Sequence, residues 1–267
     1  MELEKICMEV CDIAKETGIF IKDNVLKISG ENIDRKGVHD FVTYVDKTSE
    51  QKIVNRLIKI LPDSGFIVEE NTIDKKSDDF NWVIDPLDGT TNYIHGLAPY
   101  AISIALMKHD EVLLGVVFEV GAHECFYTWK NSPSFLDGNI IKVSEIEKVN
   151  DSLIATGFPY YDYKRVKPFL ATLEFFMNNS HGIRRLGSAA TDLAYVACGR
   201  FEAFYEYSLS PWDVAAGSLI VKNADGLTGD FSGSKNFIFG KEIIASNAKI
   251  YKEFLNIINN IMGKINH

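Results

Sequence analysis

The fold and chemistry of this chain depend most on one stretch, residues 81–92, which reads Asn-Trp-Val-Ile-Asp-Pro-Leu-Asp-Gly-Thr-Thr-Asn. Its apolar start, residues 82–84, predicts a buried strand that stops at Asp85. Pro86 fixes φ and has no N–H, and Gly89 permits a tight bend, so the chain is expected to turn at once. The stretch therefore predicts a strand, a sharp turn and then the opening of a helical turn.

This turn carries groups that suit both a cation and a phosphate. Asp85 and Asp88 can converge on a hard divalent cation, and the carbonyl of Leu87 can supply a further oxygen. The backbone N–H groups that open a helical turn after Gly89 are donors for a phosphate. An ordinary turn is the alternative, because Asp-Pro and Asp-Gly are common turn dipeptides. The turn alone leaves both interpretations open.

Further acidic residues stand at the ends of apolar segments. Glu69 and Glu70 follow a short apolar strand, Asp46 lies at the start of a helix, and Trp212-Asp213 opens an apolar helix. Their ordinary roles would be a solvated strand end, a helix N-cap and a first-turn acid. Spacing alone does not establish whether these acids meet.

Composition limits the classes of partner. The chain has 267 residues, and 28 Lys and Arg against 37 Asp and Glu leave a net charge of −9. This acidic balance argues against a general nucleic-acid or membrane binder, which uses a basic field to attract phosphates. A small phosphate ligand stays compatible, because a bound cation can invert the field in one cleft. We expect the basic pair Arg184-Arg185 to be a solvated strand edge.

The chain also carries signals about its compartment. Residues 1–5 include two Glu and no apolar core, which is unlike a signal peptide. No apolar run reaches the roughly 18 residues of a membrane span. Four scattered cysteines, Cys7, Cys11, Cys125 and Cys198, are expected to be buried reduced thiols. A cytoplasmic location is the expectation.

Hydrophobic patterning predicts an α/β protein in two parts. Residues 1–147 are expected to form an α+β part with an antiparallel sheet and most of the acids, and residues 148–267 an α/β part. The functional site is expected where the two parts meet. Helices are predicted from Leu3, with only a loose interruption at Gly18, then in a second segment up to Leu61, over 165–178, and from Ser188, Pro211 and about residue 248. Strands are predicted at 66–68, 82–84, 100–107, 112–120, 124–129, 153–156, 182–186, 201–207 and near 237–245, with a loop at 28–41.

The acids and the turn described above, taken together, closely resemble the motifs of the inositol monophosphatase family of magnesium-dependent, lithium-sensitive phosphatases. The resemblance rests on Glu69, on the stretch 82–92 and on Trp212-Asp213 far downstream. Further matching motifs follow in order along almost the whole chain: Asp-Phe-Val-Thr at 40–43 with Asp46, Ala-Thr-Gly-Phe-Pro at 155–159, and Arg-Leu-Gly-Ser-Ala-Ala at 185–190. The resemblance implies a layered αβαβα sandwich.

The resemblance also implies a role for each matching position. The implied metal ligands are Glu69, Asp85, Asp88, Asp213 and the Leu87 carbonyl, holding two or three Mg²⁺ ions. Asp46 and Thr90 would be the pair that, with Glu69, orients the attacking water. The implied substrate-binding residues are Asp88, Gly89, Thr90, Thr91, Ala189, Glu206 and Asp213.

The implied reaction is hydrolysis of inositol 1-phosphate, or of a related sugar or polyol phosphate, by in-line attack of a metal-activated water. Alternatives on the same fold are fructose 1,6-bisphosphatase and 3′,5′-bisphosphate nucleotidase activity. A non-catalytic binding protein associated with transcription is a further alternative. The resemblance also implies a homodimer, and neither a nucleic acid nor a membrane is an expected partner.

Overall fold

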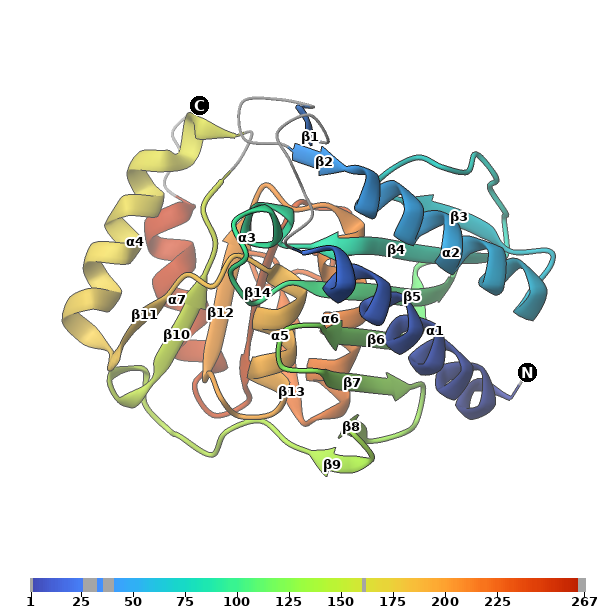
Figure 1. The fold of residues 1–267 in the computed structure, drawn as a ribbon. Coiled ribbons are helices and arrows are strands. Elements are labelled where there is room, and N and C mark those ends of the chain that lie inside the picture. Colours follow the sequence, from blue (N-terminus) through green and yellow to red (C-terminus); the bar gives the residue numbers. More distant parts are fainter. Residues whose placement is uncertain (1, 26–32, 36–40, 160–161, 264–267) are drawn as a thin grey trace.

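The protein is described from a computed structural model that covers residues 2–25, 33–35, 41–159 and 162–263 (Figure 1). The helices are α1 Leu3–Asn24, α2 Tyr44–Ile60, α3 Thr90–Ile94, α4 Val166–Asn179, α5 Ala189–Ala197, α6 Pro211–Asn223 and α7 Tyr251–Met262. The strands of the first half are β1 Ile33–Arg35, β2 Phe41–Thr43, β3 Gly65–Val68, β4 Phe80–Asp88, β5 Ala101–Lys108, β6 Glu111–Glu119, β7 Glu124–Trp129, β8 Ser134–Leu136 and β9 Asn139–Ile141. Those of the second half are β10 Leu153–Thr156, β11 Gly182–Arg184, β12 Ala203–Tyr207, β13 Gly226–Gly229 and β14 Glu242–Asn247.

Two large sheets form the frame. The first sheet has the strand order β3-β4-β5-β6-β7-β8-β9, and only its β3–β4 pair is parallel. The second has the order β11-β10-β12-β14-β13, with β11, β10 and β12 parallel and the other two pairs antiparallel. β1 and β2 form a separate antiparallel hairpin.

Three helix layers enclose these sheets (Figure 1). Helices α1 and α2 cover one face of the first sheet, α5 and α6 lie between the sheets, and α4 and α7 cover the outer face of the second. Alternation along β4 shows the layering directly. Trp82 and Ile84 join the core beneath α1 and α2, whereas Val83 joins the core around α5 and α6. The predicted αβαβα sandwich is therefore confirmed.

Small residues let α6 pack closely against the first sheet and against α5. A Cβ atom at Gly115 on β6 would lie 2.7 Å from the carbonyl oxygen of Ala216 on α6. A Cβ atom at Gly217 would lie 2.6 Å from the Cβ of Leu193 on α5. Both distances are shorter than any normal contact, so larger residues there would push α6 away. This close approach brings the start of α6 to the end of β4.

The strand at the opening stretch differs from its prediction. We expected it to stop at Asp85, but β4 continues to Asp88. Its pairing with β5 shifts register between Asp85, which lies opposite Ser103, and Asp88, which lies opposite Ala101. A bulge therefore replaces the predicted end of the strand, and it accommodates Pro86, which cannot donate a ladder hydrogen bond.

Other differences concern short or weakly patterned segments. Strands β8, β9 and β13 have only three or four residues and were not predicted. The strand expected near 237–245 begins only at Glu242, and the last helix begins at Tyr251, because Asn247 Oδ1 accepts the N–H groups of Lys249 and Ile250 before it. Most of the predicted loop 28–41 lies outside the described residues, but its described part belongs to the hairpin of β1 and β2, so the loop prediction was wrong there. Cys7, Cys11 and Cys125 are free and buried as predicted, and Cys198 is half-buried.

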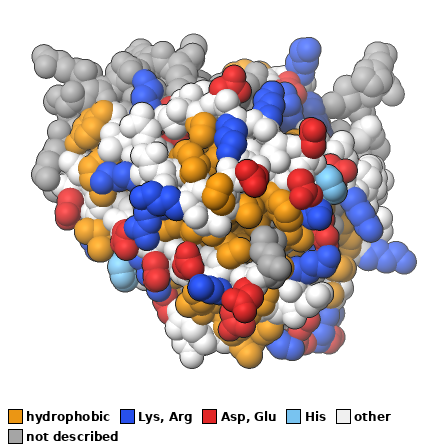
Figure 2. All heavy atoms as spheres, turned by 90° about the vertical axis from the view of Figure 1, so that its right-hand side faces the viewer, with side chains coloured by type: hydrophobic (Ala, Val, Ile, Leu, Met, Phe, Trp, Pro, Cys, Tyr) orange, Lys and Arg blue, Asp and Glu red, His pale blue; other side chains and the backbone are white. Residues whose placement is uncertain are grey.

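One face of the molecule carries charges of both signs. Figure 2 shows Lys and Arg side chains interspersed with Asp and Glu around a group of hydrophobic side chains. This face therefore presents no extended basic field. Among the described helices, none is both long and apolar enough to cross a membrane.

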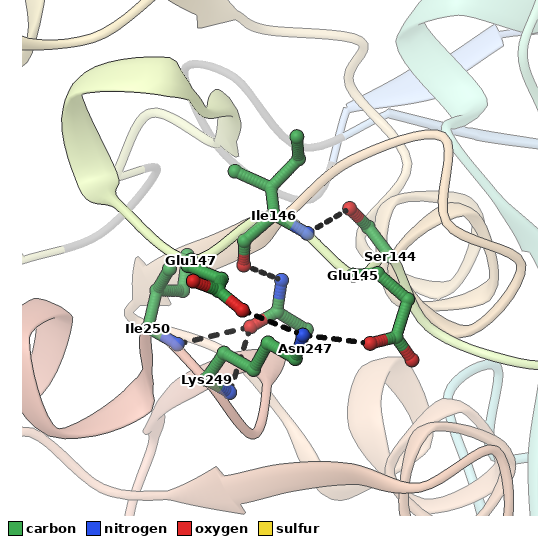
Figure 3. Close-up of polar contacts among 7 residues, drawn as sticks. All are labelled: Ser144, Glu145, Ile146, Glu147, Asn247, Lys249 and Ile250. Carbon is green, nitrogen blue, oxygen red and sulfur yellow. Dashed lines mark hydrogen bonds and ion pairs between the residues drawn. The ribbon is translucent and has the colours of Figure 1, made fainter.

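The connection between the two sheets is fastened to the second one (Figure 3). The buried Asn247, at the end of β14, donates its amide to the carbonyl of Ile146 at 3.0 Å. Lys249 Nζ lies 2.9 Å from Glu145 Oε2 and 3.0 Å from Glu147 Oε1. The buried hydrogen bond from Asn247 and the exposed ion pairs of Lys249 therefore both hold residues 145–147.

Candidate functional site

The bulge in β4 presents two carboxylates on the same short segment. Asp85 is buried, and its Oδ1 accepts the N–H of Leu87 at 2.9 Å. This bond closes the backbone around Pro86 and directs Asp88 toward the second sheet. There Asp88 Oδ2 accepts both the Ser188 hydroxyl and the Ala190 N–H at 2.7 Å. Asp88 therefore connects the first sheet to the start of α5.

A third carboxylate arrives from α6. Asp213 lies in the first turn of this helix, and its Oδ2 accepts the N–H of Ser210 at 2.7 Å. One carboxylate oxygen from each of Asp85, Asp88 and Asp213 lies within 4.8 Å of the other two. Residues 125 positions apart in the sequence thus converge on one point.

A fourth acid, Glu69, follows β3 directly. Its N–H donates to the carbonyl of Ile84 at 3.3 Å, which continues the parallel pairing of β3 with β4. The buried Glu50 of α2 holds the next residues, since its carboxylate accepts the N–H groups of Glu70 at 2.7 Å and Thr72 at 2.8 Å. Glu50 was not predicted as part of the site. It fixes the backbone that presents Glu69.

The four acids share an environment that disfavours negative charge. Burial, followed by repulsion from Asp213, raises the pKa of Glu69 well above its ordinary value, and burial followed by repulsion from Glu69 does the same for Asp85. Burial raises the pKa of Asp88 to about 6, although Ser188 opposes the shift. Burial and the charge of Asp88 raise the pKa of Asp213 to about 7.

This donor set fits a divalent metal ion. Among the described residues, no Lys or Arg forms an ion pair with any of the four acids. Buried carboxylates require compensation, and hard oxygen donors gathered at one point suit Mg²⁺. A cation at this point would remove the repulsion that raises the four pKa values.

The segment after the bulge brings Thr90 next to Asp46, a buried acid in the first turn of α2. Thr90 Oγ1 lies 3.1 Å from Asp46 Oδ1 and 3.0 Å from the Leu87 carbonyl oxygen. Gly89 precedes the short helix α3 with φ of +92°, a left-handed conformation that favours glycine. Thr91 is half-buried in the first turn of α3. Asp46 and Thr90, paired by the resemblance, are therefore in contact.

The second sheet and α5 border the other side of the acids. Ala189 is the first residue of α5, next to the two groups that bind Asp88. Glu206 lies buried on β12, where a Cβ atom at Gly157 would approach its carboxylate to 2.0 Å. Gly157 thus leaves room for this carboxylate. Burial, followed by repulsion from Asp192 and Asp213, raises the pKa of Glu206 well above its ordinary value.

The prediction for Arg185 was wrong. Arg184 is exposed at the end of β11, but Arg185 is half-buried, with its guanidinium carbon 5.2 Å from the ring centre of Phe158. Its positive charge lowers the pKa values of Asp88 and Glu206 against the larger effect of burial. The pair therefore divides between solvent and the site, with Arg184 ending the edge strand β11 and Arg185 following it.

Sequence reasoning also missed Ser188, Asp192 and Asn92. Ser188 caps α5, accepting the N–H of Thr191 at 3.3 Å, and a serine before an apolar helix is a signal that could have drawn attention to it. Asp192 is buried one turn into α5, and neither of its carboxylate oxygens has a hydrogen-bond partner among the described residues. Asn92 donates to the carbonyl of Leu186, 94 positions away, a contact for which the sequence carries no local signal.

Comparison with known proteins supports the resemblance across the whole architecture. A sequence model of the inositol monophosphatase family matches residues 2–262. The "Nus factor SuhB" of Pseudomonas aeruginosa is 38% identical over 250 residues, which cover 92% of each chain. The "fructose-1,6-bisphosphatase/inositol-1-monophosphatase" of Thermotoga maritima is 37% identical over 88% of this chain and 89% of the relative. The crystal structure of the extragenic suppressor protein suhB from Bartonella henselae superposes with a TM-score of 0.90 at 32% identity, covering 95% of this chain and 98% of the other.

Proposed function

The chain belongs to the inositol monophosphatase family, and from that premise we propose that it hydrolyses inositol 1-phosphate or a related sugar or polyol phosphate. One observation carries this proposal. Oxygens of Asp85, Asp88 and Asp213 lie within 4.8 Å of one another. In the sequence, Asp88 is followed at once by Gly89 and by the N–H groups that open α3. A metal site beside backbone donors is the arrangement that a phosphate monoester requires, because the ester is dianionic and needs positive charge and donors together.

The proposed metal ligands are Glu69, Asp85, Asp88, Asp213 and the Leu87 carbonyl. Two or three Mg²⁺ ions held by this set would neutralise the phosphate and make water a stronger nucleophile. The backbone N–H groups of Gly89, Thr90 and Thr91 are proposed to hold the phosphate oxygens.

The catalytic residues in this proposal are Glu69, Thr90 and Asp46. Glu69 and the Thr90 hydroxyl orient the attacking water, and Asp46 holds that hydroxyl at 3.1 Å. The water oxygen attacks phosphorus opposite the ester oxygen, so the bond to water forms as the bond to the alcohol breaks. The departing alkoxide takes a proton from a second water, and the proton that the attacking water loses restores that second water, so the products are the alcohol and inorganic phosphate.

Substrate recognition is proposed for two of the acids, Asp88 and Asp213, and for Ala189 of α5 and Glu206 of β12, which border the acids on the side of the second sheet. The buried carboxylate of Glu206 favours hydroxyl groups over a second phosphate, which it would repel. Arg185, whose charge acts on Glu206, weakens that preference. Fructose 1,6-bisphosphate and adenosine 3′,5′-bisphosphate therefore remain alternative substrates. The name of the Thermotoga maritima relative joins the first of these activities to inositol phosphate hydrolysis.

The test is Mg²⁺-dependent phosphate release from inositol 1-phosphate, fructose 1,6-bisphosphate, adenosine 3′,5′-bisphosphate and glycerol 2-phosphate. Each substrate is compared between wild-type protein and Asp88→Asn. We expect the highest kcat/KM with inositol 1-phosphate and a loss on the order of 10³-fold in the variant. Folded wild-type protein that releases no phosphate from any of the four substrates would refute the proposal.

A second candidate function is that of a Nus factor, the name carried by the Pseudomonas aeruginosa relative. A binding role of this kind would be independent of the acids. Capture of RNA polymerase by wild-type protein and equally by Asp88→Asn would support it. The mixed charges on the face in Figure 2 offer no basic field there for a nucleic acid.

We also propose a homodimer and inhibition by lithium, both implied by the family. Sedimentation velocity of the purified protein tests the first. The second is tested by measuring inositol 1-phosphate hydrolysis with LiCl, against KCl at equal ionic strength as the control.

A further inference from the structure

We infer that Asn92 is a positioning residue that sets the geometry between the phosphate side and the hydroxyl-recognising side of the proposed site. This inference rests on the proposed function. The two sides come from different sheets: β4 and α3 contribute the metal and phosphate groups, whereas Leu186–Ala190 and β12 contribute the substrate contacts. Substrate discrimination requires both sides to be held in one geometry.

Asn92 joins these two sides directly. Its Nδ2 donates to the Leu186 carbonyl at 2.7 Å, across 94 residues of sequence, and to the Pro99 carbonyl at 2.8 Å. The side chain is buried, with 9% of its surface exposed. Both of its amide hydrogens are therefore used, and neither carbonyl would regain an equivalent donor without exposure to water.

The backbone around this amide is packed too tightly to shift independently. A Cβ atom at Gly187 would lie 3.1 Å from both Asn92 Nδ2 and Oδ1. A Cβ atom at Gly89 would lie 3.1 Å from the carbonyl oxygens of both Gly187 and Pro99. The segments at residues 89, 99 and 187 thus meet around one side chain. Gly89 leads into the proposed phosphate donors, and Gly187 leads into the segment that contacts substrate.

Loss of the amide should release Leu186 and its neighbours Arg185 and Gly187 relative to α3. Ser188 and Ala190 still bind Asp88 in such a variant, so the shift is expected at Arg185, whose charge acts on Glu206. The effect is therefore expected in the choice among substrates. Phenyl phosphate, which has no hydroxyl groups to recognise, depends on the phosphate side alone.

The experiment compares Asn92→Ala with Asn223→Ala in the full-length protein. Asn223 is a matched control, since its Nδ2 also joins two elements, donating to Thr128 Oγ1 at 2.8 Å and the Trp129 carbonyl at 3.0 Å, away from the proposed site. The measured quantity is kcat/KM for inositol 1-phosphate divided by kcat/KM for phenyl phosphate. We expect this ratio to fall about tenfold in Asn92→Ala and to stay within about twofold in Asn223→Ala.

A second readout is independent of activity. Without added metal or substrate, amide hydrogen exchange in a peptide covering residues 185–191 should be faster in Asn92→Ala than in Asn223→Ala. If Asn92→Ala does not fold, Asn92→Asp keeps the side-chain shape and removes both donors. Its added charge would weaken hydrolysis of both substrates alike, so the ratio remains informative.

The outcomes separate this inference from the proposed function. If the wild-type protein is active, an unchanged ratio of the two kcat/KM values in Asn92→Ala would overturn the role of Asn92. An unchanged exchange rate at residues 185–191 in that variant would do the same. Wild-type protein that hydrolyses neither phosphate ester would overturn the proposed function, and this inference with it.

Discussion

Two acidic clusters of this protein differ in how their charge is compensated. At the proposed site, oxygens of Asp85, Asp88 and Asp213 lie within 4.8 Å of one another. At the connection between the sheets, Glu145 and Glu147 flank Lys249 at 2.9 and 3.0 Å (Figure 3). The second cluster is exposed and contains its own cation, whereas in the first Asp85 is buried, Asp88 and Asp213 are half-buried, and no ion pair forms within the described residues.

The pKa shifts of the two clusters have opposite directions. The hydrogen bond and charge of Lys249 lower the pKa of Glu147. Burial and mutual repulsion raise the pKa values of Asp85 and Asp213. Acids that are costly in the protein alone are expected where a ligand supplies the missing charge. Compensation, rather than the number of acids, therefore distinguishes the candidate metal site from a surface contact.

Asp213→Asn should change activity more than any other substitution considered in this comparison. Loss of one proposed ligand should lower kcat/KM for inositol 1-phosphate on the order of 10³-fold. The melting temperature without Mg²⁺ should stay the same or rise, because the substitution removes a repelling charge. Steady-state kinetics and calorimetry measure the two effects. A large loss of both activity and metal-free stability would mean that Asp213 acts mainly as a structural helix cap.

The pH dependence of Mg²⁺ binding sharpens the same contrast. The raised pKa values, about 7 for Asp213 and about 6 for Asp88, mean that protons compete with the metal as the pH falls through this window. The Mg²⁺ dissociation constant should rise about tenfold per pH unit just below pH 7, and more steeply below pH 6. Titration calorimetry between pH 5.5 and 8 provides the measurement. A constant affinity over that range would contradict the raised values.

Asp192→Asn examines a buried acid outside the proposed ligand set. Burial and the charge of Asp88 raise the pKa of Asp192 well above its ordinary value of 3.8. Above that value the folded state binds more protons than the unfolded one, so this group lowers stability as the pH rises. Asp192→Asn should increase the free energy of unfolding by about 1–2 kcal/mol at pH 8 and by less at pH 5. Urea denaturation at the two pH values tests this, and equal gains would argue against a buried charge.

Lys249→Met should have the smallest effect. Exposed ion pairs contribute little, and salt screens them. We expect unchanged phosphatase activity and a slightly lower melting temperature, with the difference disappearing in high salt. The buried Asn247 amide continues to hold Ile146 in this variant. A large, salt-independent loss of stability would show that the ionic contact is the main fastening.

Much of the fold was predictable, since its elements carry local patterns. The helix from Leu3, the hairpin of β5 and β6, and the turn after β4 follow from apolar periodicity and from Pro and Gly. The paired strands β8 and β9 could not be predicted in this way, because each has only three residues, too few to show a hydrophobic pattern. The end of the strand at Asp85 was also misjudged, because a bulge let the ladder resume at Asp88.

Local patterns in the sequence are enough to predict the layered α/β fold, the family and the acids worth considering, because strand and helix periodicity and turn chemistry act over a few residues. Which polar groups meet depends instead on the tertiary packing. Asp88 reaches Ser188 and Ala190, Asn92 reaches Leu186, and Arg185 is half-buried over the Phe158 ring. These contacts join the two sheets, and they depend on how closely small residues let α5 and α6 pack between them, a property of the whole assembly that no short segment encodes.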